Sequence, residues 1–228
     1  MTESADYKVE ACFGFPESEK TGSTTDLYLI RHGATEANIQ RPSWLQGCGT
    51  DLPLSPLGRK QASALAYALR FVTFDRILSS PLARAQETAS YIAEQQKVDI
   101  ESYTALKEVD VGNWEGKDWE TIAVKDPVVY QQFISDPAIY GYPDGETFSQ
   151  VLQRCKTTIE DSIHSLMGKS VAVVAHNVVN RCYLADLLRI PLAHARKIRQ
   201  DNGCVNLIRM SDGQRQLITL NAVPATPG

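Results

Sequence analysis

An arginine and a histidine stand side by side at the end of an apolar run, where Arg31 and His32 follow "LYLI" over 27–30. A guanidinium carries a permanent positive charge and can grip two oxygens of an anion with its planar fork. An imidazole titrates near neutral pH and serves as either a donor or an acceptor of protons. A second histidine, His176, ends the apolar run "SVAVVA". These residue types in these places indicate an anion pocket that contains an imidazole.

A second arginine, Arg84, lies in the first turn of the helix expected after "FDRILSS" at 74–80. Taken singly, each of these residues has an ordinary structural explanation, because a lone histidine at a strand end is more often hydrogen-bonded and structural. Ligands of open α/β sheets bind at the carboxyl ends of the strands, close to helix N-termini that favour anions. The joint occurrence at three strand ends therefore favours one shared pocket.

The elements that must position these residues alternate between strands and helices along the chain. We expect strands over 27–30, 74–80, 99–106, 170–176, 204–210 and 216–223 and helices over 57–71, 81–96, 148–167 and 178–189. This alternation is typical of an α/β fold, here a three-layer sandwich with a mostly parallel sheet flanked by helices. A small cap is expected to be inserted after the third strand.

The chain is expected to form a single domain over 26–228, preceded by a flexible N-terminal extension over 1–25. The extension is polar and carries neither a long apolar run nor the arginine-rich composition of a transit peptide. The segment at about 109–147 is acidic, aromatic and punctuated by prolines, and we interpret it as the cap.

Composition excludes some classes of partner. The net charge is −4 and the pI about 5.6, without the basic excess of a nucleic-acid-binding protein. No apolar stretch approaches the roughly 18 residues that cross a membrane. The five cysteines are widely spaced, which favours free thiols in a reducing compartment. We therefore expect a cytoplasmic protein with no nucleic-acid or membrane partner; homodimer formation is left open.

Five segments in this order, "LIRHGATEAN", "SSPLARAQETA", "LKEVDVGNWEG", "PDGETF" and "AVVAHNVVNR", resemble the histidine phosphatase superfamily. That group includes the cofactor-dependent phosphoglycerate mutases and many small phosphatases. The resemblance covers about residues 26–220. The third segment is most similar to that of the alpha-ribazole and broad-specificity phosphatases.

The resemblance implies a phosphohistidine mechanism with no metal and no cofactor. His32 would attack phosphorus as a neutral imidazole, which needs no prior loss of a proton. Arg31, Arg84 and His176 would supply positive charge to the phosphoryl oxygens, and Glu108 would protonate the leaving group and later activate water. The implied substrate-binding residues are Gly33, Thr35, Asn38, Gln46, Gly47 and Asn177.

Two of these positions carry further expectations. Gly33 would let the backbone approach the ligand closely. Asn177 departs from the family pattern, since many members have glycine after the second histidine. Asparagine tolerates positive φ better than most residues, so the turn is expected to survive. Its side chain would alternatively contact the phosphate or the substrate.

The same chemistry serves a mutase or a phosphatase, and the cap decides between them here. It holds only Lys117 and Lys125 as basic residues against eight carboxylates. An acidic cap repels a polyanion, so we expect a phosphomonoesterase that acts on a small sugar- or nucleoside-like phosphate. Four aromatic residues would contact the substrate body or simply pack the cap: Trp44, Trp114, Tyr140 and Tyr142. Phosphoglycerate mutase-type transfer and a catalytically inactive phosphate-binding module remain the alternatives.

Overall fold

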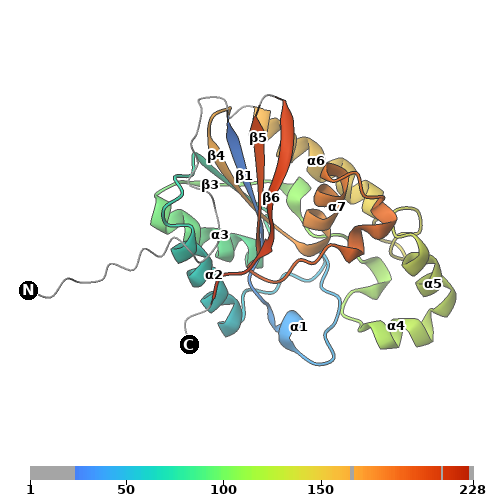
Figure 1. Cartoon of the computed structure of the whole chain (residues 1–228). Coiled ribbons are helices and arrows are strands. Elements are labelled where there is room, and N and C mark those ends of the chain that lie inside the picture. The colour runs from blue at the N-terminus through green and yellow to red at the C-terminus, as the bar shows by residue number, and fades with distance from the viewer. Residues whose placement is uncertain (1–23, 165–166, 212, 226–228) are drawn as a thin grey trace, which may run out of the picture.

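The computed structural model describes residues 24–164, 167–211 and 213–225. One six-stranded sheet of order β3-β2-β4-β1-β5-β6 runs through it (Figure 1). The strands are β1 (Thr25–Arg31), β2 (Arg76–Ser79), β3 (Ile100–Ser102), β4 (Ser170–Ala175), β5 (Val205–Ser211) and β6 (Gln214–Ala222). The helices of the main layers are α1 (Glu36–Ile39), α2 (Pro56–Ala68), α3 (Ala83–Gln96), α6 (Phe148–His164) and α7 (Asn177–Leu187).

The first four strands pair in parallel, and the last two form an antiparallel hairpin beside β1. Helices α2 and α3 cover one face of the sheet, while α6 and α7 cover the other (Figure 1). The expected α/β architecture with a mostly parallel sheet and flanking helices is therefore confirmed.

Successive side chains of β1 pack on opposite faces of the sheet, because side chains alternate along a strand with a period of two residues. Leu27 and Leu29 pack into the cluster under α6 and α7, whereas Tyr28 and Ile30 pack into the cluster under α2 and α3. All four side chains are buried, and so is nearly every residue of this central strand. The residues that follow β1 are thus held on a rigid, fully packed element.

Several expected boundaries shift. The strand expected over 99–106 splits into β3 and a 3₁₀ helix, η1 (Thr104–Leu106). The cause is the partner strand, because β2 ends at Ser79 and offers no further backbone to pair. The helix expected from residue 81 begins at Ala83 with Leu82 as its N-cap, so Pro81 lies before the helix rather than in its first turn.

The other helix boundaries move by a few residues. The helix expected over 57–71 is α2, whose first residue Pro56 follows the N-cap Ser55. The Ser55 hydroxyl oxygen accepts a hydrogen bond from the Gly58 N–H and so pairs one of the free donors at the helix start. The helix expected over 148–167 is described as far as His164, and residues 165–166 lie outside the described residues.

The cap follows β3 and contains η2 (Gly112–Trp114), α4 (Trp119–Lys125) and α5 (Pro127–Ser135). Its centre is an aromatic cluster in which Trp114 has edge contacts with Trp119, Phe133 and Tyr142. This cluster is continuous with the core on the α6–α7 face of the sheet. The cap is therefore fixed to the sheet layer by a shared apolar core.

Two expectations concern the ends of the chain and membranes. β1 already begins at Thr25, so the expected extension over 1–25 overlaps it by one residue, and residues 1–23 lie outside the described residues. Within the described ranges, none of the helices combines the length and the apolar character that spanning a membrane requires.

Candidate active site

The two motif histidines meet because their strands are neighbours. β1 and β4 pair in parallel with Arg31 opposite Ala175, so both strands end at the same edge of the sheet. The backbone N–H of His32 continues this pairing by donating to the carbonyl oxygen of Ala175 at 3.1 Å. As a result, the imidazole rings of His32 and His176 lie with their centroids 5.1 Å apart.

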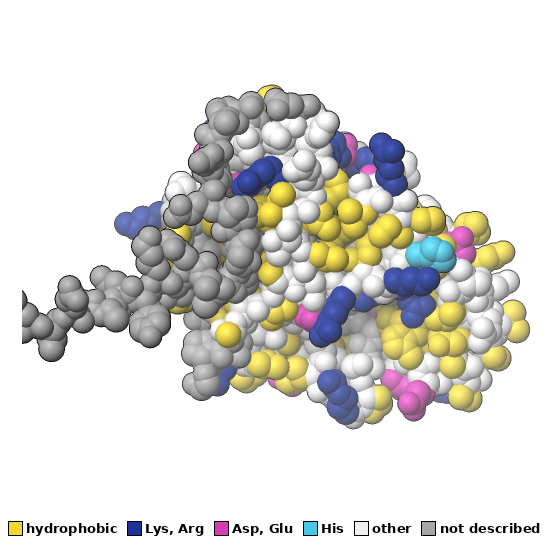
Figure 2. All heavy atoms as spheres, in the orientation of Figure 1, with side chains coloured by type: hydrophobic (Ala, Val, Ile, Leu, Met, Phe, Trp, Pro, Cys, Tyr) yellow, Lys and Arg dark blue, Asp and Glu magenta, His cyan; other side chains and the backbone are white. Residues whose placement is uncertain are grey.

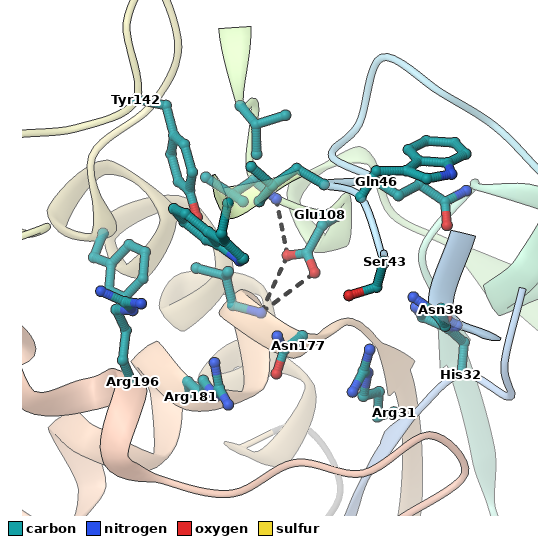
Figure 3. A pocket seen from close by; sticks show the side chains of 17 residues that line it. Arg31, His32, Asn38, Ser43, Gln46, Glu108, Tyr142, Asn177, Arg181 and Arg196 are labelled. Atoms are coloured by element: carbon teal, nitrogen blue, oxygen red, sulfur yellow. Dashed lines mark hydrogen bonds between the residues drawn. The ribbon is translucent and has the colours of Figure 1, made fainter. Parts of the chain in front are cut away.

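A pocket of about 200 Å³ opens at this edge, between the strand ends and the cap (Figure 3). This volume is below the roughly 300–1,000 Å³ typical of drug-sized ligand sites, which indicates a small ligand. Its polar lining residues are Arg31, His32, Asn38, Ser43, Gln46, Glu108, Asn177, Arg181 and Arg196, with Trp44, Trp119, Tyr142 and Phe148 among its aromatic and apolar ones.

His32 is held in a defined tautomer. Its Nδ1 lies 2.6 Å from the carbonyl oxygen of Gly33, and because a carbonyl only accepts, Nδ1 carries the proton. Nε2 then keeps its lone pair. Burial lowers the pKa of His32 well below 6.5, and the positive charges of Arg84 and Arg31 lower it further. The neutral form of the ring is therefore favoured at neutral pH.

His176 is fully buried and neither ring nitrogen has a hydrogen-bond partner among the described residues. Burial lowers the pKa of its imidazole well below 6.5, with Arg84 and His32 contributing in the same direction. These surroundings disfavour the charged form of the ring, and the expected supply of positive charge by His176 stays a prediction. A neutral imidazole still provides one N–H donor and one acceptor.

The two motif arginines donate to backbone carbonyl oxygens, and Arg84 also lies 4.0 Å from a carboxylate oxygen of Asp51. Arg31 donates from a terminal nitrogen to Gln200 at 2.6 Å, and Arg84 donates to Thr50 at 3.1 Å and to Gly47 at 3.0 Å. Arg84 is only 1% exposed, and the Nε atoms of both arginines are buried without a hydrogen-bond partner in the described part of the chain. Buried, unpaired donors of this kind cost stability unless an acceptor reaches them.

Glu108 lines the pocket across from Arg31 (Figure 3). Its side chain is 5% exposed and accepts hydrogen bonds from the backbone N–H groups of Val109, at 2.9 Å, and Val178, at 3.2 and 3.3 Å. Val178 lies in the first turn of α7, directly after the His176 motif. The carboxylate is thereby fixed relative to both histidines.

The expected substrate-binding residues fall into two groups. Asn38, Gln46 and Asn177 line the pocket, whereas Gly33, Thr35 and Gly47 are not among its lining residues. Thr35 supports the others: its hydroxyl group lies 2.6 Å from Gln46 Oε1, and its backbone N–H donates to Asn38 Oδ1 at 3.1 Å. Direct contact of these six residues with a substrate stays a prediction.

The two glycines of the set are explained by packing. A Cβ on Gly33 would lie 2.5 Å from the carbonyl oxygen of Gly58, at the start of α2. One on Gly47 would lie 2.7 Å from the carbonyl oxygen of Val109. The absence of a side chain at Gly33 therefore lets two protein backbones approach each other, and the expected close approach to a ligand stays a prediction.

Asn177 needs no unusual backbone. It is the first residue of α7, preceded by His176 as the N-cap in extended conformation, and its φ is not positive. The expected dependence on tolerance of positive φ is therefore wrong. The side chain lines the pocket, and its buried Oδ1 has no hydrogen-bond partner within the residues that the structure describes.

The aromatic residues expected to contact a substrate also fall into two groups, those that line the pocket and those that do not. Trp44 and Tyr142 line the pocket, but Trp114 is buried in the cap core and its Nε1–H donates to Asp126 at 2.9 Å. Tyr140 is exposed and lies outside the pocket lining. Trp119 and Phe148, which the sequence did not single out, complete the aromatic wall.

The acidic residues of the cap do not face the pocket, which corrects the charge argument made from composition. None of the eight is a lining residue, and several hold the cap backbone instead. Asp118 caps α4, and Glu115 accepts from the N–H of Gly47. The lining instead gains two arginines from outside the cap, Arg181 and Arg196. Arg181 lies about one turn after Asn177 on α7, a spacing that would have indicated a shared face.

Within the described ranges, no three His, Cys, Asp or Glu side chains come together in a cluster that would hold a metal ion. The four cysteines of these ranges are free thiols.

Comparison with known proteins adds relatives. The chain is 31% identical to phosphoserine phosphatase 1 of Hydrogenobacter thermophilus over 86% of this chain and 91% of the relative. It is 30% identical to the adenosylcobalamin/alpha-ribazole phosphatase of Salmonella typhimurium over 86% of this chain and 96% of the relative. It is also 26% identical to the probable phosphoglycerate mutase GpmB of Salmonella arizonae, over 82% and 86% of the two chains.

Solved structures share the fold. YhfR of Bacillus stearothermophilus matches with a TM-score of 0.80 at 30% identity, covering 89% of this chain and 98% of the other. A mycobacterial glucosyl-3-phosphoglycerate phosphatase matches with a TM-score of 0.79 at 27% identity, over 87% and 99% of the two chains. The family model of the histidine phosphatase superfamily (branch 1) matches residues 27–223. The arrangement of both histidines, the arginines and Glu108 at one sheet edge thus stands in a chain that belongs to the histidine phosphatase superfamily.

Proposed function

We propose that the protein is a phosphomonoesterase that works without a metal, through a phosphohistidine on His32, and acts on a small-molecule phosphate. The observation that carries the proposal is the state of His32. Its Nδ1–H is bound to the carbonyl oxygen of Gly33, and its pKa is lowered by burial and by Arg84 and Arg31. Such a ring offers Nε2 as a nucleophile over the whole neutral range.

In the first step the lone pair of Nε2 forms a bond to phosphorus while the bond from phosphorus to the ester oxygen breaks. The buried guanidinium groups of Arg31 and Arg84 would bind the phosphoryl oxygens, which is the main contribution a protein makes to phosphoryl transfer. Their Nε atoms, which have no partner among residues 24–164, 167–211 and 213–225, would be available to donate. A neutral His176 would add one more N–H donor.

Glu108 would act on the proton. As an acid it would protonate the leaving alkoxide, and as a carboxylate it would take a proton from the water that then cleaves the P–N bond. Such a group contributes about 10²- to 10⁴-fold. Its two backbone donors, Val109 and Val178, hold the carboxyl group in place for both steps.

Hydrolysis rather than mutase-type transfer is supported by the two relatives that are at least 30% identical, a phosphoserine phosphatase and an alpha-ribazole phosphatase, whereas the probable phosphoglycerate mutase GpmB is 26% identical. The size of the pocket and its wall of Trp44, Trp119 and Tyr142 suit a compact ester whose carbon body is small or sugar-like. Catalytic residues His32, Glu108 and Arg84 are all present, which disfavours an inactive binding module.

The test is release of phosphate from p-nitrophenyl phosphate in the presence of EDTA, with the native protein and the His32→Ala variant. We expect release that survives the chelator and is lost in the variant. In the native protein we also expect a phosphoprotein intermediate that is stable in alkali and labile in acid. An acid quench of the kind that preserves other phosphoamino acids would therefore destroy it. Release abolished by EDTA, or retained by His32→Ala, would refute the proposal.

A further inference from the structure

Two arginines outside the expected catalytic set line the same pocket as His32. Arg181 comes from α7 and Arg196 from η3 (Leu192–Lys197). Across the view of Figure 3, the labelled residues follow one another from His32 through Arg31, Asn177 and Arg181 to Arg196. The pocket therefore has a phosphate end, at His32, and a second cationic end.

Neither of these two guanidinium groups is neutralised by an ion pair with the described residues. Arg181 donates from Nε to the carbonyl oxygen of Ile198 at 2.8 Å, which fixes its direction without cancelling its charge. The guanidinium carbon of Arg196 lies 5.3 Å from the ring centroids of both Trp119 and Phe133. Burial lowers the pKa of Arg181, the positive charges of Arg31 and Arg196 lower it further, and the negative charge of Glu108 opposes this decrease.

Like charges gathered in a pocket raise its free energy unless a ligand of opposite charge enters. Figure 2 shows Lys and Arg side chains around the hollow beside the α4–α5 side of the molecule. A phosphate bound at His32 would engage Arg31 and Arg84. That leaves the charges of Arg181 and Arg196 for a different group on the same ligand.

We infer that the substrate carries a carboxylate a few bonds away from its phosphate ester, and that Arg181 and Arg196 bind this carboxylate. The planar fork of arginine matches a carboxylate in two-pronged geometry. A carboxylate is also smaller than a second phosphate, which suits a pocket of about 200 Å³. The inference rests on the proposed phosphatase function, and it replaces the neutral substrate body expected from the composition of the cap.

The test compares esters that differ only in this group. Phosphoserine is paired with phosphoethanolamine, which lacks its carboxylate, and 3-phosphoglycerate is paired with glycerol 3-phosphate, which has a hydroxymethyl group there. For the native protein we expect kcat/KM to be about 10- to 100-fold higher for the carboxylate member of at least one pair, the range of hydrogen bonds to charged groups.

Variants then locate the effect. In Arg181→Gln and Arg196→Gln, the ratio of the two kcat/KM values within a pair should fall toward one. This ratio cancels any general loss of activity. Lys197→Gln, an exposed position in the same η3 segment, removes the same charge outside the pocket lining and should leave both the activity and the ratio unchanged.

Each outcome decides between the two proposals. Native ratios near one, or ratios that survive both arginine variants, overturn the inference and leave the phosphatase standing if p-nitrophenyl phosphate is hydrolysed. A bisphosphate turned over faster than either carboxylate ester also overturns it, because the second group would then be a phosphate. Failure to hydrolyse any ester overturns the phosphatase proposal. In that case calorimetric affinities for phosphoserine and phosphoethanolamine decide the inference, with tighter phosphoserine binding supporting it and equal binding overturning it.

Discussion

The side chain of Asn202 joins two parts of the site, because its Nδ2 donates both to the carbonyl oxygen of His32, at 3.2 Å, and to Asn38 Oδ1, at 3.1 Å. Asn38 Oδ1 also accepts from the Thr35 backbone N–H at 3.1 Å. With its oxygen so occupied, Asn38 presents its amide Nδ2 as a donor on the pocket lining. The segment that follows β1 and the loop that precedes β5 are thereby fixed to each other.

Asn38→Asp tests this orientation. The new carboxylate keeps the acceptor that Thr35 and Asn202 require, so the fold should be preserved, but it replaces a donor by a negative oxygen in the pocket. We expect kcat/KM for a phosphomonoester to fall by about 10²-fold or more, through loss of a donor and repulsion of the dianion. Steady-state kinetics and the melting temperature measure both effects. Unchanged kcat/KM at unchanged stability would show that Asn38 does not contact phosphate.

Glu108→Gln separates proton transfer from binding. The amide retains the shape and one acceptor oxygen for the Val178 N–H. We expect kcat/KM for an alkyl phosphate to fall by about 10²- to 10⁴-fold, because a poor leaving group depends on an acid. For p-nitrophenyl phosphate the decrease should be much smaller. Equal losses for both substrates would argue against an acid role for Glu108.

Acid should destabilise the fold through its buried histidines. The pKa of His176 lies well below 6.5 in the folded state, so below pH 6.5 the unfolded chain binds more protons and unfolding becomes more favourable. Above pH 6.5 this contribution vanishes. The free energy of unfolding should fall by up to about 1.4 kcal/mol per pH unit for each such histidine between pH 6.5 and its folded pKa.

His176→Gln should therefore give a shallower slope of unfolding free energy against pH below 6.5, as measured by urea titrations at several pH values. His194→Gln, at an exposed position, serves as the control and should keep the slope of the native protein. The explanation would fail if the His176 variant kept that slope as well.

Gly58→Ala should impair catalysis without touching the pocket. A Cβ at this position would lie 2.0 Å from the carbonyl oxygen of Ala34, so the loop after His32 must shift. Because displacements of about 1 Å at a catalytic group can cost 10²-fold, we expect a loss of at least tenfold in kcat. Ser63→Ala, on the exposed face of the same helix, is the matched control and should behave as the native protein.

The sequence predicted the sheet edge well because strand ends are local features. Arg31, His32 and His176 each follow directly on an apolar run, and parallel pairing of β1 and β4 then brings them together. The length of β3 was not predictable in this way. It depends on where β2 stops, and β2 lies more than twenty residues earlier in the chain.

The charge of the pocket was predicted wrongly from the sequence, because composition gives the number of charged side chains but not the direction in which each one points. Asp118 and Asp126 belong to the cap, yet one caps α4 and the other accepts from Trp114. Arg196 reaches the pocket from η3, a short 3₁₀ helix after α7 whose position follows from tertiary packing. No periodicity in the sequence marks it.

The central position of β1 also bears on how the chain folds. Its two sheet neighbours, β4 and β5, are made from the last third of the chain, so its pairings are among the most distant in sequence. Such non-local contacts form slowly, since the loop between them must close first. During synthesis, His32 leaves the ribosome early, and β1 has no strand to pair with until β4 and β5 have been synthesised. Catalytic competence is therefore a late event, and chains released before β5 should be targets for chaperones and proteases rather than partly active enzymes.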